Sequence, residues 1–431
     1  MSDTLLEDLK SFLDSSPTSW HCTREVQKRL VEKGFVPLQE KEAFWNLKPG
    51  GKYCVIRGGS IAAFLLPQTH PPSRLVMLAA HTDSPALKVK PHPDIYEKGM
   101  HFLGVEVYGG PILHSWLNRD LALAGRVFFS NEEEAVQETL LFFKDIPLMI
   151  PELAIHFQRE VNEKGPLVNA QEHLLPLLSL SHQKEHTPTP LEQLLIQRIP
   201  SCKTLLSFDL FLVPLQPACF LGVQHEMLAS YRIDNLTSVH AATCALTHVE
   251  NTSSALPLAI FWDHEEVGSH SWEGASSSFL DDLLLRIKKF SHPMDDEAFL
   301  AFKHRSLCLS LDMAHAFHPQ HAQKHDPIHA PILGGGIVFK SNANLNYASS
   351  SYSLSNALSL CQKAHLAHQT FVMRSDMRCG STVGPIVAAK TGIPTIDLGC
   401  PQLSMHSCRE LLATKDYLDL YTFLTHSLTH T

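Results

Sequence analysis

The distribution of apolar and polar residues predicts a sheet of buried strands accompanied by helices. Four largely apolar runs are candidate strands, and the first of them is apolar on both faces, which is typical of a central parallel strand. They are "RLVMLAA" from Arg74, "ALPLAIFW" from Ala255, "SLCLSL" from Ser306 and "PTIDLG" from Pro394. Before the first run, apolar residues at helical spacing predict a helix over Leu5–Phe12 and a second helix that ends at Gly34.

The pattern changes between about Pro91 and Gln224. Short alternating segments such as "GVEVYGG" and "LALAGRVFFS" predict antiparallel strand pairs, and "SHQKEHTPTPLEQ" predicts a solvated loop. The apolar strands return after "YRIDNLTSVHAATCALTHVE", where a polar strand end leads into a long helix. We therefore predict an α/β domain with a central mixed sheet flanked by helices, formed by residues 1–90 and 225–431. A smaller, mostly β domain at residues 91–224 interrupts it.

Composition and charge exclude several classes of partner. The chain has 431 residues, is 44% hydrophobic and carries a formal net charge of -9 at pH 7, without a Lys/Arg block that could neutralise phosphates. The start "MSDTLLEDLKSFLDSS" has no signal-peptide pattern, and no apolar run is long enough to span a bilayer. The ten cysteines stand singly, which favours reduced thiols. We expect a cytoplasmic protein that binds neither nucleic acid nor membrane and acts on peptides or small molecules.

Acidic and imidazole side chains gather where the predicted strands end. The set at strand ends or at the start of the long helix is His81, Asp83, Asp234, Glu265, Glu266, Asp312 and His406. Ligands collect at the carboxyl edge of parallel strands, so these side chains should converge. Mixed imidazole and carboxylate ligands suit zinc, and two cations would remove the repulsion between the carboxylates. One glutamate of the "EE" pair would bind metal, and its neighbour would take a proton from metal-bound water.

Three other interpretations of these motifs are a single-zinc helix, a cysteine or serine nucleophile, and a solvated acidic turn. "HEEVG" does not match the single-zinc HExxH helix, because Gly268 stands where the second His belongs. "RCGSTVG" could offer Cys379 or Ser381 as a nucleophile, although a glycine turn before a helix more often binds an anion through its N–H groups. A solvated acidic turn would account for "EE" alone, but it explains poorly why an apolar strand ends there.

Seven motifs, in order, resemble those of the aspartyl aminopeptidase family of dinuclear zinc exopeptidases. They are "HTDSP", "RIDNL", "DHEEVGS", "DMAHAFHP", "KHD", "CGSTVGP" and "LSMHSCRE". The resemblance covers almost the whole chain, including "YGGPILHSWLNRDLALAGRV" and "ELAIHFQREVNEKG" in the predicted insertion. It implies a zinc-peptidase-like catalytic domain interrupted by a dimerisation domain, and a homo-oligomer that is a dodecamer built from dimers.

The resemblance also implies a ligand set. Asp234 would bridge two zinc ions in each subunit. One ion would also be held by His81 and Asp312, and the other by Glu266 and His406. Co²⁺ or Mn²⁺ could take the place of Zn²⁺, because site affinity does not settle metal choice in cells.

Catalytic and substrate-binding roles follow from the same resemblance. Glu265 would be the general base, and Asp83 would support the histidine ligand. His156, within "LAIHF", would enter the active site of a partner subunit. Lys340 and Tyr347 would line the substrate pocket, where a lysine favours an acidic side chain. We expect a metalloaminopeptidase that removes N-terminal Asp or Glu from peptides. The alternatives are an aminopeptidase of the same family with broad or neutral specificity and a non-catalytic metal-binding assembly protein.

Three positions depart from the family pattern. "ILGGGIVFK" is rich in glycine where relatives usually have a Gly-Pro turn, Asn346 stands where an Arg is usual, and "VPLQPA" lacks the usual acidic residue before Gln216. These positions lie near the predicted substrate pocket or the domain junction, outside the metal ligands. They bear on the acidic preference more than on the peptidase chemistry.

Overall fold

The computed structural model describes residues 2–68, 72–180, 188–250, 254–290 and 294–429. The chain forms two compact units. Unit 1 consists of Met1–Asp83, Ala218–Met405 and Glu410–Thr431, and unit 2 consists of Ser84–Pro217 and His406–Arg409. The boundaries predicted from the sequence, before Pro91 and after Gln224, fall slightly later than these junctions. The separate four-residue segment was not predicted.

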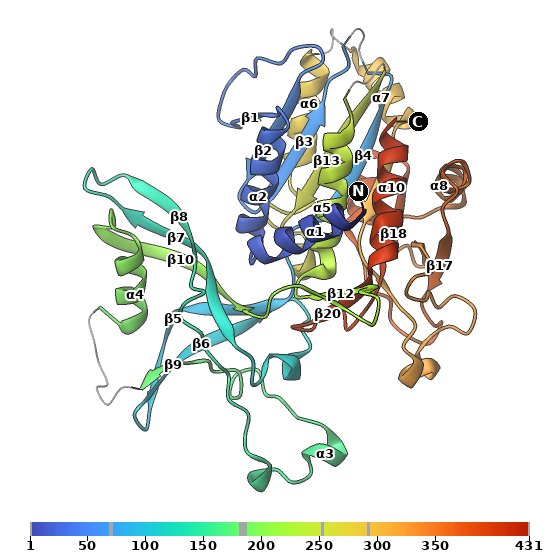
Figure 1. Cartoon of the computed structure of the whole chain (residues 1–431). Coiled ribbons are helices and arrows are strands. Elements are labelled where there is room, and N and C mark those ends of the chain that lie inside the picture. Colours follow the sequence, from blue (N-terminus) through green and yellow to red (C-terminus); the bar gives the residue numbers. More distant parts are fainter. Residues whose placement is uncertain (1, 69–71, 181–187, 251–253, 291–293, 430–431) are drawn as a thin grey trace. The chain divides into compact units, whose positions relative to one another are not determined.

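Unit 1 contains a nine-stranded sheet in the order β1-β2-β3-β13-β4-β14-β18-β16-β17 (Figure 1). Its strands are β1 (Val36–Leu38), β2 (Lys52–Arg57), β3 (Ser60–Leu65), β4 (Arg74–His81), β13 (Ala255–Trp262), β14 (Leu307–Leu311), β16 (Ile337–Ser341), β17 (His368–Val372) and β18 (Thr395–Gly399). The central strands β13, β4, β14 and β18 are parallel neighbours and coincide with the four apolar runs. β3 and β16 pair antiparallel with this central group. The predicted mixed α/β sheet is therefore confirmed.

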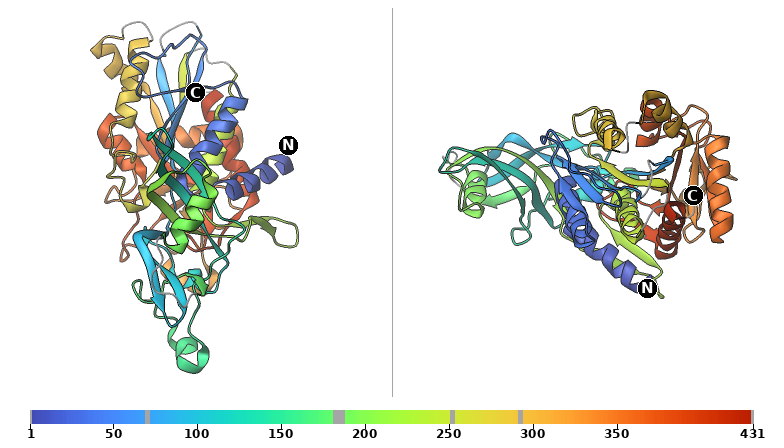
Figure 2. Two further views of the ribbon diagram at one scale, coloured as in Figure 1. Left: turned by 90° about the vertical axis from the view of Figure 1, so that its left-hand side faces the viewer. Right: turned by 90° about the horizontal axis from the view of Figure 1, so that it is seen from above.

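Helices cover both faces of this sheet, which explains why its central strands are apolar throughout. In β13, Ala259 and Phe261 pack into one core, while Leu258 and Ile260 pack into the other. The helices against the first core are α1 (Ser2–Ser15), α2 (Ser19–Glu32), α5 (Ile233–His248), α8 (Ser351–Ala364) and α10 (Thr414–Thr429). Those against the second are α6 (Phe279–Phe290), α7 (Asp296–Arg305) and α9 (Val383–Thr391). The right-hand view of Figure 2 shows α6 across the sheet from α1 and α2.

A smaller five-stranded sheet in unit 1 has the order β11-β12-β20-β19-β15. Its strands are β11 (Cys219–Leu221), β12 (Met227–Ser230), β15 (Ala314–His315), β19 (Pro401–Leu403) and β20 (Glu410–Ala413). β12 comes just before α5, and β15 comes just after β14. This sheet therefore supports the segments that continue from the ends of the central strands.

Unit 2 is built on a six-stranded antiparallel sheet in the order β8-β7-β10-β5-β6-β9. Its strands are β5 (Ala86–Glu97), β6 (Met100–Tyr108), β7 (Leu121–Ser130), β8 (Val136–Phe142), β9 (Leu177–Leu180) and β10 (Thr204–Pro214). Short helical segments complete the unit: η1 (Leu113–Trp116), η2 (Ile155–Phe157), α3 (Val161–Lys164) and α4 (Pro190–Arg198).

Helix α4 corrects the loop predicted over "SHQKEHTPTPLEQ". Residues 181–187 of that loop lie outside the described residues, but the chain is helical from Pro190. Thr189 accepts a hydrogen bond from the Glu192 N–H, and the Glu192 carboxylate accepts one from the Thr189 N–H. This capping box, with proline in the first turn and Leu191 and Leu195 buried, favours a helix over a loop.

The structure also shows whether a helix could cross a membrane and whether the cysteines form disulfides. Within the described parts of the chain, no helix is both long enough and apolar enough to cross a bilayer. All ten cysteines fall in those parts, and each is a free thiol there.

Candidate metal centre

The pairing register brings the ends of three parallel strands to one level. Trp262 of β13 pairs with His81 of β4, and Ser310 of β14 pairs with Ala79 of β4. Asp312 comes two residues after Ser310 and is therefore level with His81. The carboxyl edge of the sheet thus holds His81, Asp312 and the turn that follows Trp262.

Asp234 reaches the same edge from the start of α5. Its main-chain N–H donates to Oε2 of Glu410 at 3.0 Å. The side-chain amide of Asn235 donates to the carbonyl oxygen of Leu311 at 2.7 Å, directly before Asp312. These buried bonds tie the "IDN" segment to β20 and β14, so the Asp234 carboxylate is held beside the strand ends.

His81, Asp234 and Asp312 form a buried group of metal-binding atoms. Nε2 of His81 lies 3.4 Å from Oδ1 of Asp234 and 3.6 Å from Oδ1 of Asp312. The ligand atoms of these three residues lie within 4.8 Å of one another, and the same holds for His81 with Glu265 and Glu266. The structure therefore brings together five side chains that are far apart in the sequence.

Asp83 holds the turn that carries both glutamates, η3 (Glu265–Val267). Its Oδ1 accepts the N–H of Glu265 and its Oδ2 accepts the N–H of Glu266, each at 3.1 Å. Nδ1 of His81 lies 3.1 Å from the main-chain oxygen of Asp83 and 3.5 Å from its carboxylate. The Asp83 side chain thus fixes the acidic turn, while its main chain contacts the imidazole more closely than the carboxylate does.

The gathered carboxylates shift the pKa values in the site. Burial raises the pKa of Glu265 to about 8, and the negative charges of Asp312 and Asp83 act in the same direction. Burial favours the neutral form of His81, but hydrogen bonds with Asp234 and Asp312 raise its pKa well above the ordinary value. The pKa of Glu265 is thus raised first by burial and that of His81 by the surrounding carboxylates, and a cation would offset the negative charge gathered there. One imidazole nitrogen among carboxylate oxygens is a donor set that fits zinc.

Two further buried carboxyl groups tie the segment around the acidic turn to α2 and to the hairpin of β2 and β3. Asp263 accepts hydrogen bonds from the Ser19 hydroxyl at 2.8 Å and from the N–H of His264 at 2.9 Å. Glu273 accepts the N–H of Gly59 at 2.6 Å. Burial, assisted by a neighbouring aspartate, raises the pKa of Asp263 to about 7. The hairpin therefore supports the segment that positions the glutamates.

His406 lies in the four-residue segment that belongs to unit 2. There its Nδ1 is 3.1 Å from the carbonyl oxygen of Gly110. The segment follows Met405 and precedes Glu410, both of unit 1. Its place among the metal ligands stays a prediction from the strand-edge argument and the resemblance.

The two residues predicted for the substrate pocket of the same subunit lie beside Asp312. Lys340 of β16 is 2% exposed, and its Nζ is 2.9 Å from Oδ2 of Asp312. The same ammonium lies 5.3 Å from the centre of the Tyr347 ring. Burial, together with the neighbouring Cys379, raises the pKa of Tyr347. Lys340 is therefore a buried counter-ion of a predicted metal ligand, which its sequence context does not reveal.

His156, the third predicted pocket residue, lies in unit 2 on η2, where it is exposed. Its neighbours Ile155 and Phe157 are exposed as well. The entry of His156 into the active site of a partner subunit stays a prediction from the resemblance.

The glycine turn "RCGSTVG" uses its polar groups in structural bonds. The Ser381 hydroxyl donates to the carbonyl oxygen of Asn346 at 3.2 Å, and the Asn346 amide donates to the carbonyl oxygen of Cys379 at 2.9 Å. The Thr382 hydroxyl donates to Asp397 at 2.6 Å where α9 begins. These contacts fix the turn against its neighbours and do not activate a nucleophile.

Sequence reasoning missed two buried supports of the ligand set. One is Glu410, which accepts the N–H of Asp234. The other is Arg232, whose guanidinium donates to the carbonyl oxygen of Thr82. The role of Arg232 could have been predicted from its position two residues before Asp234, because a charged residue next to a buried metal ligand often supports that ligand.

Comparisons with known proteins point to one family. A family model described as aminopeptidase I zinc metalloprotease (M18) matches residues 12–426. A probable M18 family aminopeptidase 2 from Streptomyces avermitilis is 41% identical over 418 residues, covering 95% of this chain and 94% of that protein. A protein of the same name from Pseudomonas aeruginosa (strain UCBPP-PA14) is 40% identical over 429 residues, covering 98% of each. A chain from the cryo-EM structure of the Ape4 and Nbr1 complex matches with a TM-score of 0.93 at 34% identity, covering 99% of this chain and 85% of that chain.

Proposed function

Because the chain belongs to the M18 family of aminopeptidase I zinc metalloproteases, we propose that it uses two metal ions to remove N-terminal residues, preferentially Asp or Glu, from peptides. Membership makes the chain a zinc metalloaminopeptidase. The observation that carries the finer proposal is that the buried His81, Asp234 and Asp312 meet the two half-buried glutamates of η3.

The proposed ligand set divides between two ions. His81, Asp234 and Asp312 would hold one, and Asp234, Glu266 and His406 would hold the other. His406 would bind through Nε2, because its Nδ1 faces the carbonyl oxygen of Gly110. Zn²⁺ is the metal of the family, and Co²⁺ or Mn²⁺ also accept these nitrogen and oxygen donors. When bound, the ions supply Lewis acidity for the scissile carbonyl and lower the pKa of water.

Glu265 would be the group that moves the proton. Its carboxylate lies among the ligand atoms, and its main-chain N–H is held by Asp83. A carboxylate fixed in this way can accept a proton from the attacking water and return it to the leaving amine. A metal-binding protein without catalysis would need the ligands but no such base, so the presence of Glu265 supports turnover.

An acidic preference requires a cation near the scissile bond. The resemblance assigns Lys340 and Tyr347 to the substrate pocket, and both lie close to Asp312. Since the ammonium of Lys340 is already paired with Asp312, it would act first on the metal ligand. The preference for Asp or Glu over neutral residues is therefore a separate part of the proposal with its own test.

We also propose that unit 2 is a dimerisation domain and that dimers assemble into a dodecamer. In unit 2, Leu153, Phe157 and Leu167 are 56%, 80% and 94% exposed. Large apolar side chains exposed in one region favour contact with another protein. His156 lies in this region and would enter the active site of a partner subunit. The proposed location is the cytoplasm, where free thiols persist.

The test is a panel of chromogenic Asp, Glu, Leu and Ala substrates, with the metal content of the purified protein measured in parallel. We expect release that a chelator abolishes and added Zn²⁺, Co²⁺ or Mn²⁺ restores, with the acidic substrates hydrolysed faster. Release that persists after complete metal removal would overturn the metal mechanism. No release by the zinc-loaded protein would favour a binding role, and equal rates would favour broad or neutral specificity.

A further inference from the structure

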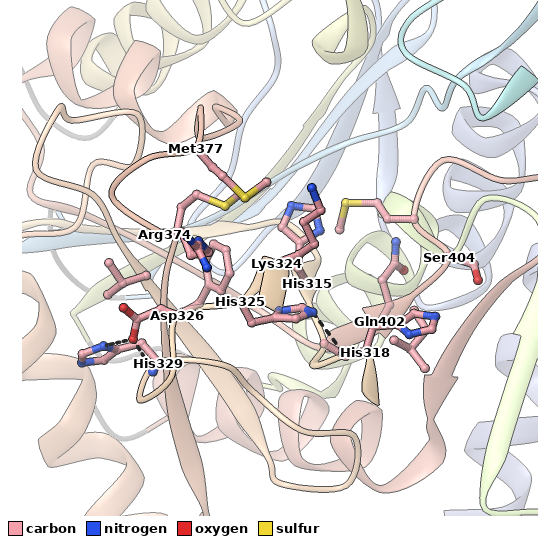
Figure 3. A pocket seen from close by; sticks show the side chains of 16 residues that line it. His315, His318, Lys324, His325, Asp326, His329, Arg374, Met377, Gln402 and Ser404 are labelled. Atoms are coloured by element: carbon pink, nitrogen blue, oxygen red, sulfur yellow. Dashed lines mark hydrogen bonds and ion pairs between the residues drawn. The ribbon is translucent and has the colours of Figure 1, made fainter. Parts of the chain in front are cut away.

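Unit 1 contains a cavity of about 260 Å³ close in sequence to Asp312 (Figure 3). Its wall is formed by residues of β15, η4 (Pro319–Lys324), the end of β17 and β19, with the segments that follow them. β15 begins two residues after Asp312, and its Ala314 and His315 pair with Pro401 and Gln402 of β19. His315, on the cavity wall, is three residues after Asp312, so the main chains of these two residues are at most about 10 Å apart.

Lys324 is the cation of this wall that has no close ion pair among the described residues, and its charge acts only at longer range on Asp376, which is paired with Arg374. Arg374 donates to both carboxylate oxygens of Asp376, at 2.8 and 2.6 Å. Asp326, the acid on the wall, accepts the N–H of Ile328 and the N–H of His329. Lys324 is exposed and, within the part of the chain that the structure describes, has no hydrogen bond or ion pair within 4.0 Å.

Lys340, unlike Lys324, is paired with a carboxylate of the same subunit. It is buried, and its ammonium is 2.9 Å from Asp312. A substrate carboxylate could engage Lys340 only in competition with a carboxylate that is needed for metal binding. Lys324 could receive a substrate carboxylate without disturbing the ligand set.

The rest of the cavity suits the stem of a peptide side chain. Phe371, Met373, Met377 and Met405 supply apolar contacts, and methionine adapts to side chains of different shape. Nδ1 of His318, also on the wall, is buried without a hydrogen-bond partner among the described residues. Because this nitrogen is covered by protein atoms, the polar contact for a ligand comes from Lys324. A short apolar stem ending in a carboxylate matches these features.

We propose that this cavity binds a carboxylate of the peptide substrate and that Lys324 determines the preference for it. The inference rests on the proposed aminopeptidase function and names the chemistry of its substrate. The carboxylate belongs to the side chain of the N-terminal residue or to that of the following residue. Both would form the same charge-assisted hydrogen bond with the ammonium.

The experiment compares acidic with neutral substrates in two arms. The first arm uses p-nitroanilides of Asp, Glu and Leu, and the second uses the dipeptide amides Leu-Asp and Leu-Leu. The variant Lys324→Met keeps the apolar stem and removes the charge. We expect it to lower the acidic-to-neutral ratio of kcat/KM about 10- to 100-fold in one arm, as for a lost charged hydrogen bond, with the neutral rate little changed. Lys324→Arg should retain most of the preference.

Lys363→Met is the matched control, because Lys363 is an exposed lysine of α8 that does not line the cavity. It should leave both ratios unchanged. An unchanged ratio in both arms for Lys324→Met, or an equal loss on every substrate, would overturn the inference while leaving the aminopeptidase function in place. Calorimetric binding of free aspartate and leucine, and of the Leu-Asp and Leu-Leu amides, to both proteins tests the cavity without turnover. Equal affinity of the wild type for the acidic and the neutral member of both pairs would overturn the inference even if the protein hydrolysed nothing.

Discussion

At the residue scale, the candidate site depends on a partnership between Asp83 and the acidic turn. Asp83 and Glu265 are 182 residues apart in the sequence. Even so, the two oxygens of the Asp83 carboxylate accept the N–H groups of Glu265 and Glu266 in that turn. The arrangement separates two tasks, since Asp83 fixes the main chain while the glutamate side chains stay available for a metal ion and a proton. Each task can be removed by a single substitution.

The variant Glu265→Gln should keep its metal ions and lose most of its turnover. Glutamine has nearly the same shape but cannot accept the proton, so kcat should fall by about two to four orders of magnitude. Metal content by mass spectrometry and kcat on an aminoacyl substrate are the two measurements. Near-normal turnover with bound metal would remove Glu265 from the mechanism.

The variant Asp83→Asn should affect both metal binding and rate, because its amide can accept only one of the two N–H bonds. Residues that support metal ligands typically contribute about 10- to 100-fold to metal affinity or activity. We expect a loss of that size in kcat and a weaker metal dissociation constant, with folding preserved by circular dichroism. An unchanged metal affinity together with unchanged kcat would show that the turn keeps its position without Asp83.

The sequence predicts the residues of this site better than their pairings. Apolar strands that end in His or carboxylate side chains are visible in the sequence, because a charged group inside a buried strand is costly without a partner. The bond between Lys340 and Asp312 is not visible, because each residue has an ordinary local context. Long-range pairing of this kind depends on the register of β14, β18 and β16 in the sheet.

At the scale of elements, the hairpin of β2 and β3 matters because it packs against the segment before the acidic turn. Gly58 and Gly59 form its two-residue loop between the paired residues Arg57 and Ser60, and Gly58 has a φ of +57°. A Cβ atom at Gly59 would lie 1.9 Å from Oδ2 of Asp263. The loop is therefore restricted to glycine by close packing as well as by conformation.

The variant Gly59→Ala should lower both stability and activity. The added methyl group must displace the Asp263 carboxylate, and overpacking of a buried site costs about 1 to 3 kcal/mol. Thermal unfolding and kcat are the measurements, and we expect Tm and kcat to fall together. Gly380→Ala is the control, because a Cβ there meets no atom within 4 Å. A normal Tm for Gly59→Ala would mean that Asp263 can move without cost.

A buried polar network joins four helices of unit 1. His240 of α5 lies with Nδ1 2.7 Å from the Tyr417 hydroxyl of α10 and with Nε2 3.0 Å from Asp8 of α1. Arg29 of α2 donates to the same Asp8 carboxylate at 2.7 Å, and the Cys244 thiol lies 3.7 Å from Nε2 of His240. Burial favours neutral His240, but Cys244 and Asp8 raise its pKa above the ordinary value.

This network should stabilise the fold most strongly in mildly acidic solution. The raised pKa of His240 gives a contribution that is complete below the ordinary value of about 6.5 and is lost as the pH rises through the folded-state pKa. The hydrogen bond with His240 lowers the pKa of Asp8, so its contribution is present above about 3.9 and is lost only at lower pH. Both contributions are complete between these values.

The variant Asp8→Asn should therefore lower Tm more at pH 6 than at pH 9. We expect the gap between wild type and variant to be about 2 to 4 °C larger at pH 6. Asp3→Asn, an exposed residue of the same helix, should show no pH-dependent gap. An equal gap for Asp8→Asn at both pH values would mean that His240 is neutral in the folded protein throughout this range.

Elements were predictable where one signal dominated. Continuous apolar runs identified the central strands, because only a sheet covered on both faces buries every position. Helix α4 was missed, because Thr and Pro before Leu191 carry a turn signal as strong as their capping signal. The choice between them is made by the burial of Leu191 and Leu195, which depends on the rest of unit 2.

At the scale of the whole molecule, the proposed assembly gives unit 2 a catalytic task. His156 is exposed on η2, next to the exposed Phe157. A histidine that served its own subunit would gain nothing from an apolar, accessible surrounding. A histidine inserted into a partner would be positioned by that surrounding when two copies pack together.

Mixing two inactive variants tests this arrangement directly. Subunits with Glu265→Gln lack the base but carry His156, and subunits with His156→Ala carry the base but lack the histidine. If His156 acts across the interface, an interface between the two kinds contains one complete site, and a random equal mixture should recover about a quarter of the wild-type sites. Co-expression with two affinity tags isolates the mixed assemblies, and each variant alone sets the background rate. If the mixed assemblies stay at the background rate, His156 acts within its own subunit. If His156→Ala alone is fully active, the histidine takes no part in catalysis.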